Sequence, residues 1–187
     1  RFSANPLFRG IRLGGGRIKN FSLDDFYGVA KKMTDRNLGI DLLIRTPELA
    51  ATAALAARIP ELHIVINHIA HVPVNGQAPD PDWVDGMRAV AQHPNVYMKG
   101  SAFVEMAQDT PAPNEVSYYV PTLDMLWDIF GENRIVYGSN WPVCERAAPY
   151  STVINIVSEY FKSKGEEAAE KYFWKNAKAA YKWIERS

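Results

Sequence analysis

Five short segments rich in β-branched and aromatic residues alternate with longer segments of helical periodicity along this chain of 187 residues. The five predicted strands cover residues 8–13, 41–45, 63–68, 95–101 and 135–139. Repeated strand–helix units build parallel sheets, and strands that consist of nearly continuous apolar runs are covered on both faces. The alternation therefore predicts an α/β protein with a parallel sheet whose strands follow one another in sequence order.

The predicted helices start at residues with capping chemistry or stop at glycine. Ser22 and Asp80 are candidate N-caps, Pro47 suits a first helical position, and Gly131 suits a helix end. The expected helices run from residue 22, from residue 46, and over 80–90, 121–130, 151–163 and 166–184. No linker or internal repeat interrupts them, so we expect residues 1–187 to form a single domain.

Polar side chains lie near the C-terminal ends of the predicted strands. They are Arg12, Arg45, His68, Ser101 and Asn140. In an open doubly wound sheet, one or two strands at the switch point carry the site, whereas in a TIM barrel every strand contributes. A barrel needs eight strands, typically in ~250 residues, and this chain has five predicted strands. The pattern alone therefore fits both folds.

Composition excludes several classes of function. The chain has 21 basic and 21 acidic side chains, so no charge excess favours nucleic acid or an anionic membrane surface. No apolar stretch approaches the ~18 residues that suggest a membrane-spanning helix. The single cysteine, Cys144, excludes an internal disulfide and a cysteine-based zinc site. We expect a cytoplasmic protein that acts on a small molecule and binds neither nucleic acid nor membrane.

The stretch from Arg134 to Cys144 contains the strongest candidate for a functional strand end. A buried strand breaks there at Gly138 and Asn140, and Pro142 stops the ladder from continuing. By alternation Val136, Gly138 and Asn140 share a face, which predicts Asn140 at the mouth of a site. The alternative is an ordinary turn, because Asn and Gly are common turn residues.

His68 ends a predicted strand and shares the parity of Ile64 and Ile66, so we expect it at the end of a row that faces the barrel interior. Its imidazole would polarise a substrate carbonyl; the alternative is a structural histidine. Arg12 and Arg45 would bind a substrate carboxylate through the guanidinium fork, or form salt bridges at the rim. His71 in the following loop, and Trp141 at the pocket wall, are further candidates for substrate contact.

Several of these segments together resemble the amidohydrolase-2 family, in the branch that contains sugar-acid lactonases and 2-pyrone-4,6-dicarboxylate lactonase. The resemblance rests on residues 5–12 (NPLFRGIR), 41–45 (DLLIR), 66–68 (INH), 93–99 (HPNVYMK) and 137–143 (YGSNWPV), and less strongly on 174–181 (WKNAKAAY). It implies a (β/α)8 barrel of the amidohydrolase type, present here as about five βα units from its C-terminal two-thirds. It also implies a hydrolase that opens a lactone or related cyclic ester of a carboxylated or sugar-acid substrate.

Two positions depart from the family pattern. Asn67-His68 stands where many relatives have Asp-His, and Asn140 stands where an Asp is the expected general base and, in metal-dependent members, a metal ligand. The family's His-x-His motif of the first strand has no counterpart here. We therefore expect His68 and Asn140 as catalytic residues and no metal in this chain, with zinc possible if a missing N-terminal His-x-His exists. The sequence also predicts that Asn140→Asp raises lactone hydrolysis.

Two other functions stay open at this point. The two asparagines and the absent motif fit a catalytically silent barrel that serves in binding or assembly. An aldolase-like or decarboxylating barrel would need a Schiff-base lysine, for which Lys99 is the candidate. Five-eighths of a barrel leaves residues 8–13 and 135–139 as open edges with uncovered apolar faces. That predicts either a homo-oligomer or a missing N-terminal segment.

Overall fold

One parallel sheet organises the protein, whose computed structural model describes residues 5–14 and 23–185. Its strands are β1 (Gly10–Gly14), β2 (Gly39–Leu43), β3 (Ile64–Ile66), β4 (Val96–Gly100) and β5 (Ile135–Tyr137). Each strand pairs in parallel with the next, in the order β1-β2-β3-β4-β5. The predicted parallel, sequential sheet is confirmed. Within the described residues the sheet does not close into a barrel.

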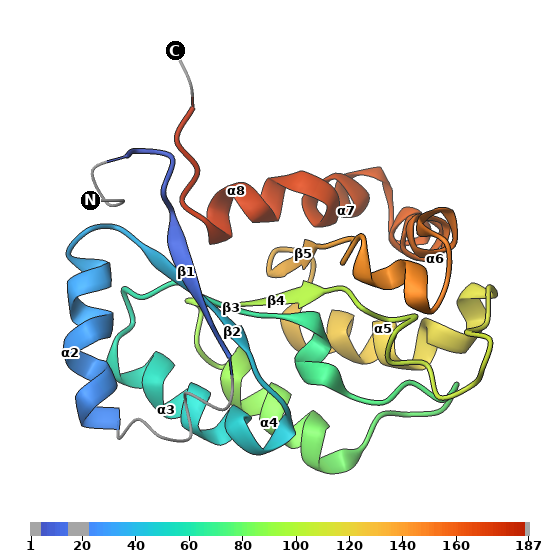
Figure 1. Ribbon diagram of the computed structural model, residues 1–187, viewed down its shortest axis with the longest axis horizontal. Coiled ribbons are helices and arrows are strands. Elements are labelled where there is room, and N and C mark those ends of the chain that lie inside the picture. The colour runs from blue at the N-terminus through green and yellow to red at the C-terminus, as the bar shows by residue number, and fades with distance from the viewer. Residues whose placement is uncertain (1–4, 15–22, 186–187) are drawn as a thin grey trace.

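A helix follows each of the first four strands, and a helical tail follows the fifth. The bounds are α2 (Leu23–Thr34), α3 (Leu49–Arg58), α4 (Pro81–Ala91), α5 (Val116–Phe130), α6 (Tyr150–Ser163), α7 (Glu166–Glu170) and α8 (Asn176–Ala180), with a π-helical turn (Lys171–Lys175) before α8. Helices α2 to α5 lie on one side of the sheet, and α7 and α8 lie on the other (Figure 1). Among these described helices, none has both the length and the apolar character needed to cross a membrane.

One helix start differs from the prediction, and one predicted N-cap lies outside the described residues. Helix α5 begins at Val116, so Pro121 lies inside it and does not start it. Tyr119, in the extra turn, is fully buried, and its hydroxyl donates a hydrogen bond to the Pro113 carbonyl at 2.7 Å. Asp80 caps α4 as predicted, since its carboxylate accepts from two backbone N–H groups. Ser22 lies outside the described residues.

The sheet has one face that packs against helices α2 to α5. Ile40, Ile64, Ile66 and Met98 are buried on that face in the main hydrophobic core. The predicted interior row of Ile64, Ile66 and His68 is therefore wrong, because both isoleucines point to the helices. Strand β3 is apolar on both faces, so alternation alone does not distinguish its helix side from its interior side.

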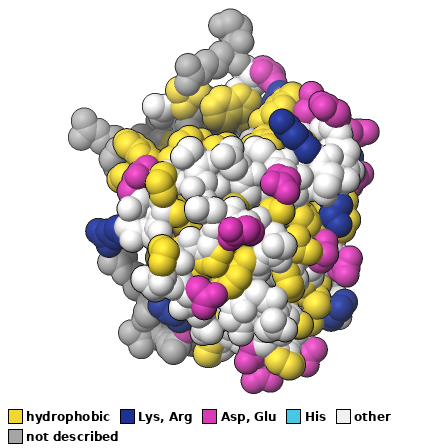
Figure 2. Space-filling model, turned by 90° about the vertical axis from the view of Figure 1, so that its right-hand side faces the viewer, with side chains coloured by type: hydrophobic (Ala, Val, Ile, Leu, Met, Phe, Trp, Pro, Cys, Tyr) yellow, Lys and Arg dark blue, Asp and Glu magenta, His cyan; other side chains and the backbone are white. Residues whose placement is uncertain are grey.

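The opposite face of the sheet, called here the inner face, carries Asp41, Val65, Lys99 and Val136. Val65 and Val136 form a second small apolar cluster with Ala180 of α8. The tail thus covers part of the inner face, so the expectation of wholly uncovered apolar faces does not hold over β3 and β5. At the edge strand β1, Ile11 is 37% exposed on the other face, which it shares with Ile40. On the outer surface seen in Figure 2, acidic, basic and apolar side chains are interspersed, without a large patch of one charge.

Candidate functional site

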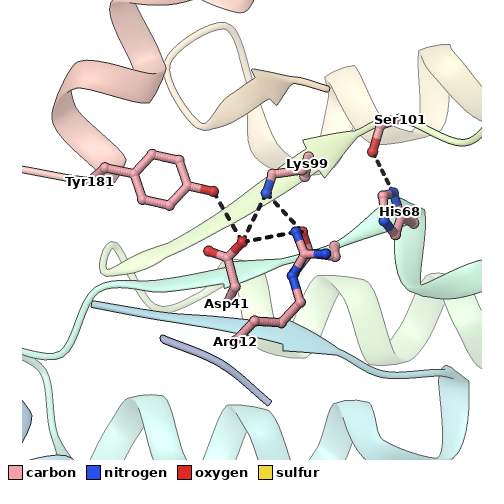
Figure 3. A network of polar contacts seen from close by, with 7 residues as sticks. Arg12, Asp41, His68, Lys99, Ser101 and Tyr181 are labelled. Carbon is pink, nitrogen blue, oxygen red and sulfur yellow. Dashed lines mark hydrogen bonds and ion pairs between the residues drawn. The ribbon is translucent and has the colours of Figure 1, made fainter. Parts of the chain in front are cut away.

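Five polar side chains from four strands and the tail form a network on the inner face (Figure 3). The Asp41 carboxylate accepts from Lys99 Nζ at 2.9 Å, from the Tyr181 hydroxyl at 3.3 Å and from Arg12 Nη2 at 3.5 Å. Asn67 Oδ1 accepts from Lys99 Nζ at 2.8 Å and from Arg12 Nη2 at 3.3 Å. Strand register makes this meeting possible, because Arg12 lies directly opposite Asp41 across β1 and β2.

Donors exceed acceptors in this network. Two cations, Arg12 and Lys99, share the single carboxylate of Asp41, and the Asn67 side chain is fully buried with its Nδ2 lacking a partner among the described residues. Burial lowers the pKa of Lys99, and the Asp41 carboxylate opposes that change. A buried N–H group without an acceptor costs about 1–3 kcal/mol. The donors of this network are therefore not all matched by acceptors among the described residues.

A strained turn after β3 carries the two histidines of the site. All four residues from His68 to His71 have left-handed backbone angles, with φ between 47° and 55°. The turn is held by the buried Trp83 indole, whose N–H donates to the Ile69 carbonyl at 2.9 Å. His71 Nδ1 lies 3.0 Å from the Ile44 carbonyl oxygen and so must carry the proton of that bond. Such left-handed runs persist only where the surroundings enforce them.

The His68 imidazole lies 2.8 Å from the Ser101 hydroxyl through its Nδ1 (Figure 3). Burial is the main cause that lowers the pKa of His68 from 6.5 to about 4, followed by the nearby ring of His71 and by the cations Arg12 and Lys99. His68 is therefore neutral at neutral pH. A neutral imidazole in this position can donate a hydrogen bond to a carbonyl oxygen or accept one from water.

Asn140 lies beyond the end of β5 in a left-handed conformation, with φ of 53°. Strand β5 stops at Tyr137, so the predicted alternation does not extend to Asn140. Its Nδ2 donates to Glu105 Oε1 at 2.6 Å. A side chain at position 138 would be crowded, because a Cβ there would lie 3.1 Å from side-chain carbons of Lys99 and Ser101.

Two carboxylates that the sequence analysis did not single out, those of Glu105 and Asp41, lie at the site. Asp41 lies inside β2 and contacts the network. Glu105, in the turn after β4, was not foreseen. Burial raises the pKa of its carboxyl, and its Oε2 is buried without a partner among the described residues.

Two predicted substrate contacts lie at the surface, apart from the network. Arg45 is exposed beyond the end of β2, and its backbone N–H donates to Glu48 Oε2 at 2.8 Å. No ion pair joins its guanidinium to a carboxylate of the described residues. Trp141 is 64% exposed beyond β5. The structure thus brings Arg12, His68 and His71 close to the inner face and leaves Arg45 and Trp141 at the rim.

The donor set of these strand ends does not fit a tight metal site. Among the described residues no group of three or more His, Cys, Asp and Glu side chains is arranged to hold a metal ion. The rings of His68 and His71 are 5.7 Å apart, and His71 already uses Nδ1 for the Ile44 carbonyl. Asn140 offers an amide in place of a carboxylate. Catalytic zinc usually takes three protein ligands, and these strand ends do not offer that number among the described residues.

Comparison with known proteins gives a consistent picture. A sequence model of the amidohydrolase family matches residues 1–183. The L-fucono-1,5-lactonase of Burkholderia ambifaria is 32% identical over an alignment of 152 positions, which covers 78% of this chain and 50% of that protein. The L-rhamnono-gamma-lactonase of Scheffersomyces stipitis is 28% identical over an alignment of 147 positions, which covers 70% of this chain and 44% of that protein. The chain thus spans about half the length of these curated relatives.

Solved structures share the arrangement of strands and helices. An amidohydrolase from Bifidobacterium longum subsp. infantis superposes with a TM-score of 0.72 at 27% identity, covering 94% of this chain and 62% of that one. An amidohydrolase from Burkholderia multivorans with bound zinc superposes with a TM-score of 0.76 at 23% identity, covering 94% and 65%. The five strands and their helices therefore match the amidohydrolase barrel, of which this chain carries five βα units.

Proposed function

Because this chain belongs to the amidohydrolase family, we propose that it acts in a hydrolase that opens a lactone or related cyclic ester of a carboxylated or sugar-acid substrate. The named lactonases among its relatives support this substrate class. We further propose that residues 1–187 form one domain, which contributes five βα units to an eight-stranded barrel.

The observation that carries the proposal is the surplus of donors on the inner face. Arg12 and Lys99 share one carboxylate, and the buried Asn67 Nδ2 lacks an acceptor among the described residues. A substrate carboxylate would complete this network, and the planar guanidinium of Arg12, whose side chain is 52% exposed, is the group best able to reach it. Arg45 and Trp141 would contact the substrate from the rim.

In the proposed reaction His68 acts on the lactone carbonyl. Its neutral imidazole, anchored through Nδ1 to Ser101, has Nε2 left to donate to the carbonyl oxygen as negative charge develops there. That assignment requires Nδ1 to accept from the Ser101 hydroxyl. Asn140, which follows β5, would hold the attacking water by hydrogen bonds. His71 lies beside His68 and would contact the substrate there.

The test is a panel of sugar-acid and dicarboxylate lactones, with hydrolysis by the full-length protein followed by pH-stat. His68→Ala is expected to lower kcat by ~10²-fold or more, as for loss of an oxyanion donor. His93→Ala, at the N-terminal edge of β4, is the matched control and should keep the wild-type rate. Turnover that survives in His68→Ala, or no turnover of any lactone, would contradict the proposal.

A catalytically silent binding protein is the second candidate, and the amides at Asn67 and Asn140 favour it. Calorimetry with hydroxy-acid products separates the two functions. A silent protein would bind these acids through Arg12 and turn over no lactone. An enzyme would show both binding and turnover, each weakened in Arg12→Lys because lysine lacks the two-pronged donor geometry.

A further inference from the structure

The turn that follows β4 connects the two proposed catalytic positions. It begins at Ser101, which contacts His68 at 2.8 Å, and reaches Glu105, which contacts Asn140 at 2.6 Å. The Met106 backbone N–H donates to the Ala102 carbonyl at 3.1 Å and closes the turn between these two contacts. A single backbone turn thus places a carboxyl group beside the strand end where the attacking water is proposed to bind.

The Glu105 carboxyl is incompletely satisfied where it lies. Oε1 accepts from the Asn140 amide, whereas Oε2 is buried without a partner among the described residues. Among the described residues, Tyr119 of α5 and Cys144 beyond β5 interact with it electrostatically, and neither is a cation. Burial raises the pKa of this carboxyl, and a higher pKa makes a carboxylate a stronger proton acceptor.

We propose that Glu105 is the proton acceptor of this site and that Asn140 is the residue that positions it. This inference rests on the proposed lactone hydrolysis. Glu105 takes one proton from water while the water oxygen bonds to the lactone carbonyl carbon. The ring C–O bond then breaks, and the same proton passes to the departing alkoxide oxygen. Water is thereby added across the ester bond, and the Glu105 carboxylate is restored.

The proposal also explains why an amide suits position 140. An Asp there would place a second carboxylate about 2.6 Å from Glu105, and two carboxylates so close do not both ionise near neutral pH. The amide instead donates its N–H to Glu105 and favours the ionised form. The expectation from sequence that Asn140→Asp raises hydrolysis is therefore reversed: the variant should share one proton between two carboxyls and lose activity at neutral pH.

Three variants test the assignment: Glu105→Gln, Asn140→Asp, and the double variant that carries both changes. Glu105→Gln should lower kcat by ~10²–10⁴-fold and abolish the acidic limb of the pH profile. Asn140→Asp should move that limb to higher pH by about one unit or more. The double variant keeps a carboxyl–carboxamide hydrogen bond but moves the carboxylate to position 140. It should regain part of kcat with an acidic limb set by the new Asp.

A purely structural role for Glu105 would leave the acidic limb at the same pH in every folded variant, and that result would overturn the proposal. Carbon-13 NMR of the glutamate carboxyls gives a readout that does not depend on activity. One resonance that disappears in Glu105→Gln should titrate above 4.5 and shift upward in Asn140→Asp. Wild-type turnover that Glu105→Gln retains refutes this proposal alone. No turnover of any lactone by the wild type refutes the proposed function and this assignment with it.

Discussion

Replacing His68 tests the electrostatics of the left-handed turn, because burial holds its imidazole neutral. The pKa of His68 falls from 6.5 in the unfolded chain to about 4 in the folded protein. Between these values the unfolded chain binds more protons than the folded protein, so the free energy of unfolding rises with pH. The free energy of unfolding therefore has its full value, as far as His68 is concerned, above pH 6.5, and it decreases as the pH falls to about 4.

The expected loss follows from the pKa difference. A fall from 6.5 to about 4 corresponds to an upper limit of ~3 kcal/mol, at about 1.4 kcal/mol for each unit of pKa. His68 keeps some contact with solvent, and screening reduces this limit to ~1–2 kcal/mol. The variant His68→Gln lacks the titrating group, so its free energy of unfolding should lack this component of pH dependence.

Urea unfolding at neutral pH and near the folded pKa of about 4 measures the effect, with His93→Gln as the matched control. The control should keep the wild-type pH dependence, since His93 lies at the opposite edge of the sheet. NMR of the four histidine rings gives a direct check, because the resonance lost in His68→Gln should titrate near pH 4. Identical pH dependence in wild type and His68→Gln would refute the reasoning.

The other predictions concern packing around the site. Trp83→Phe removes the indole N–H bond to Ile69 and should lower the free energy of unfolding by ~1–3 kcal/mol in urea unfolding, with kcat reduced through a looser His68. Asp41→Asn leaves Lys99 without its carboxylate and should lower the free energy of unfolding by ~2–3 kcal/mol. The double variant Asp41→Leu, Lys99→Met removes both charges and should lower the free energy of unfolding by less, so equal losses in the two variants would contradict this. The open sheet edges predict a sedimentation mass above the 21.0 kDa of this chain, and a well-behaved monomer of that mass would count against it.

The arrangement of the strands was predictable from the sequence because it depends on local patterns. Each strand is a short apolar run, and each is followed by a helix whose periodicity is visible without tertiary information. The strand ends were less predictable. Arg45 and His68 were placed on strands, and Asn140 directly after one, yet each lies beyond the last ladder pair of its strand. Polar residues are common both at strand ends and in turns, so their presence does not show where a strand stops and the following turn begins.

The inner face was misassigned on β3 for a different reason. Both faces of β3 are buried, one against the helices and the other against the C-terminal tail, so both carry apolar residues. Sequence parity therefore placed His68 on the row of Ile64, whereas Asn67 is the residue of that strand end that faces Lys99. Alternation fixes which residues share a face, but the identity of that face depends on the packing of other elements.

Contacts across large sequence separations account for the groups that sequence reasoning missed. Tyr181 reaches Asp41 over 140 residues, and Glu105 reaches Asn140 over 35 residues. Neither pair has a fixed spacing that would serve as a motif. The nearest signal was the polar pair Lys99 and Ser101 at the end of the fourth predicted strand. Strand β4 lies between β3 and β5, so the turn that follows it can contact both neighbouring strand ends. A turn in that central position is the place to search for an acid or base when the expected strand end carries an amide.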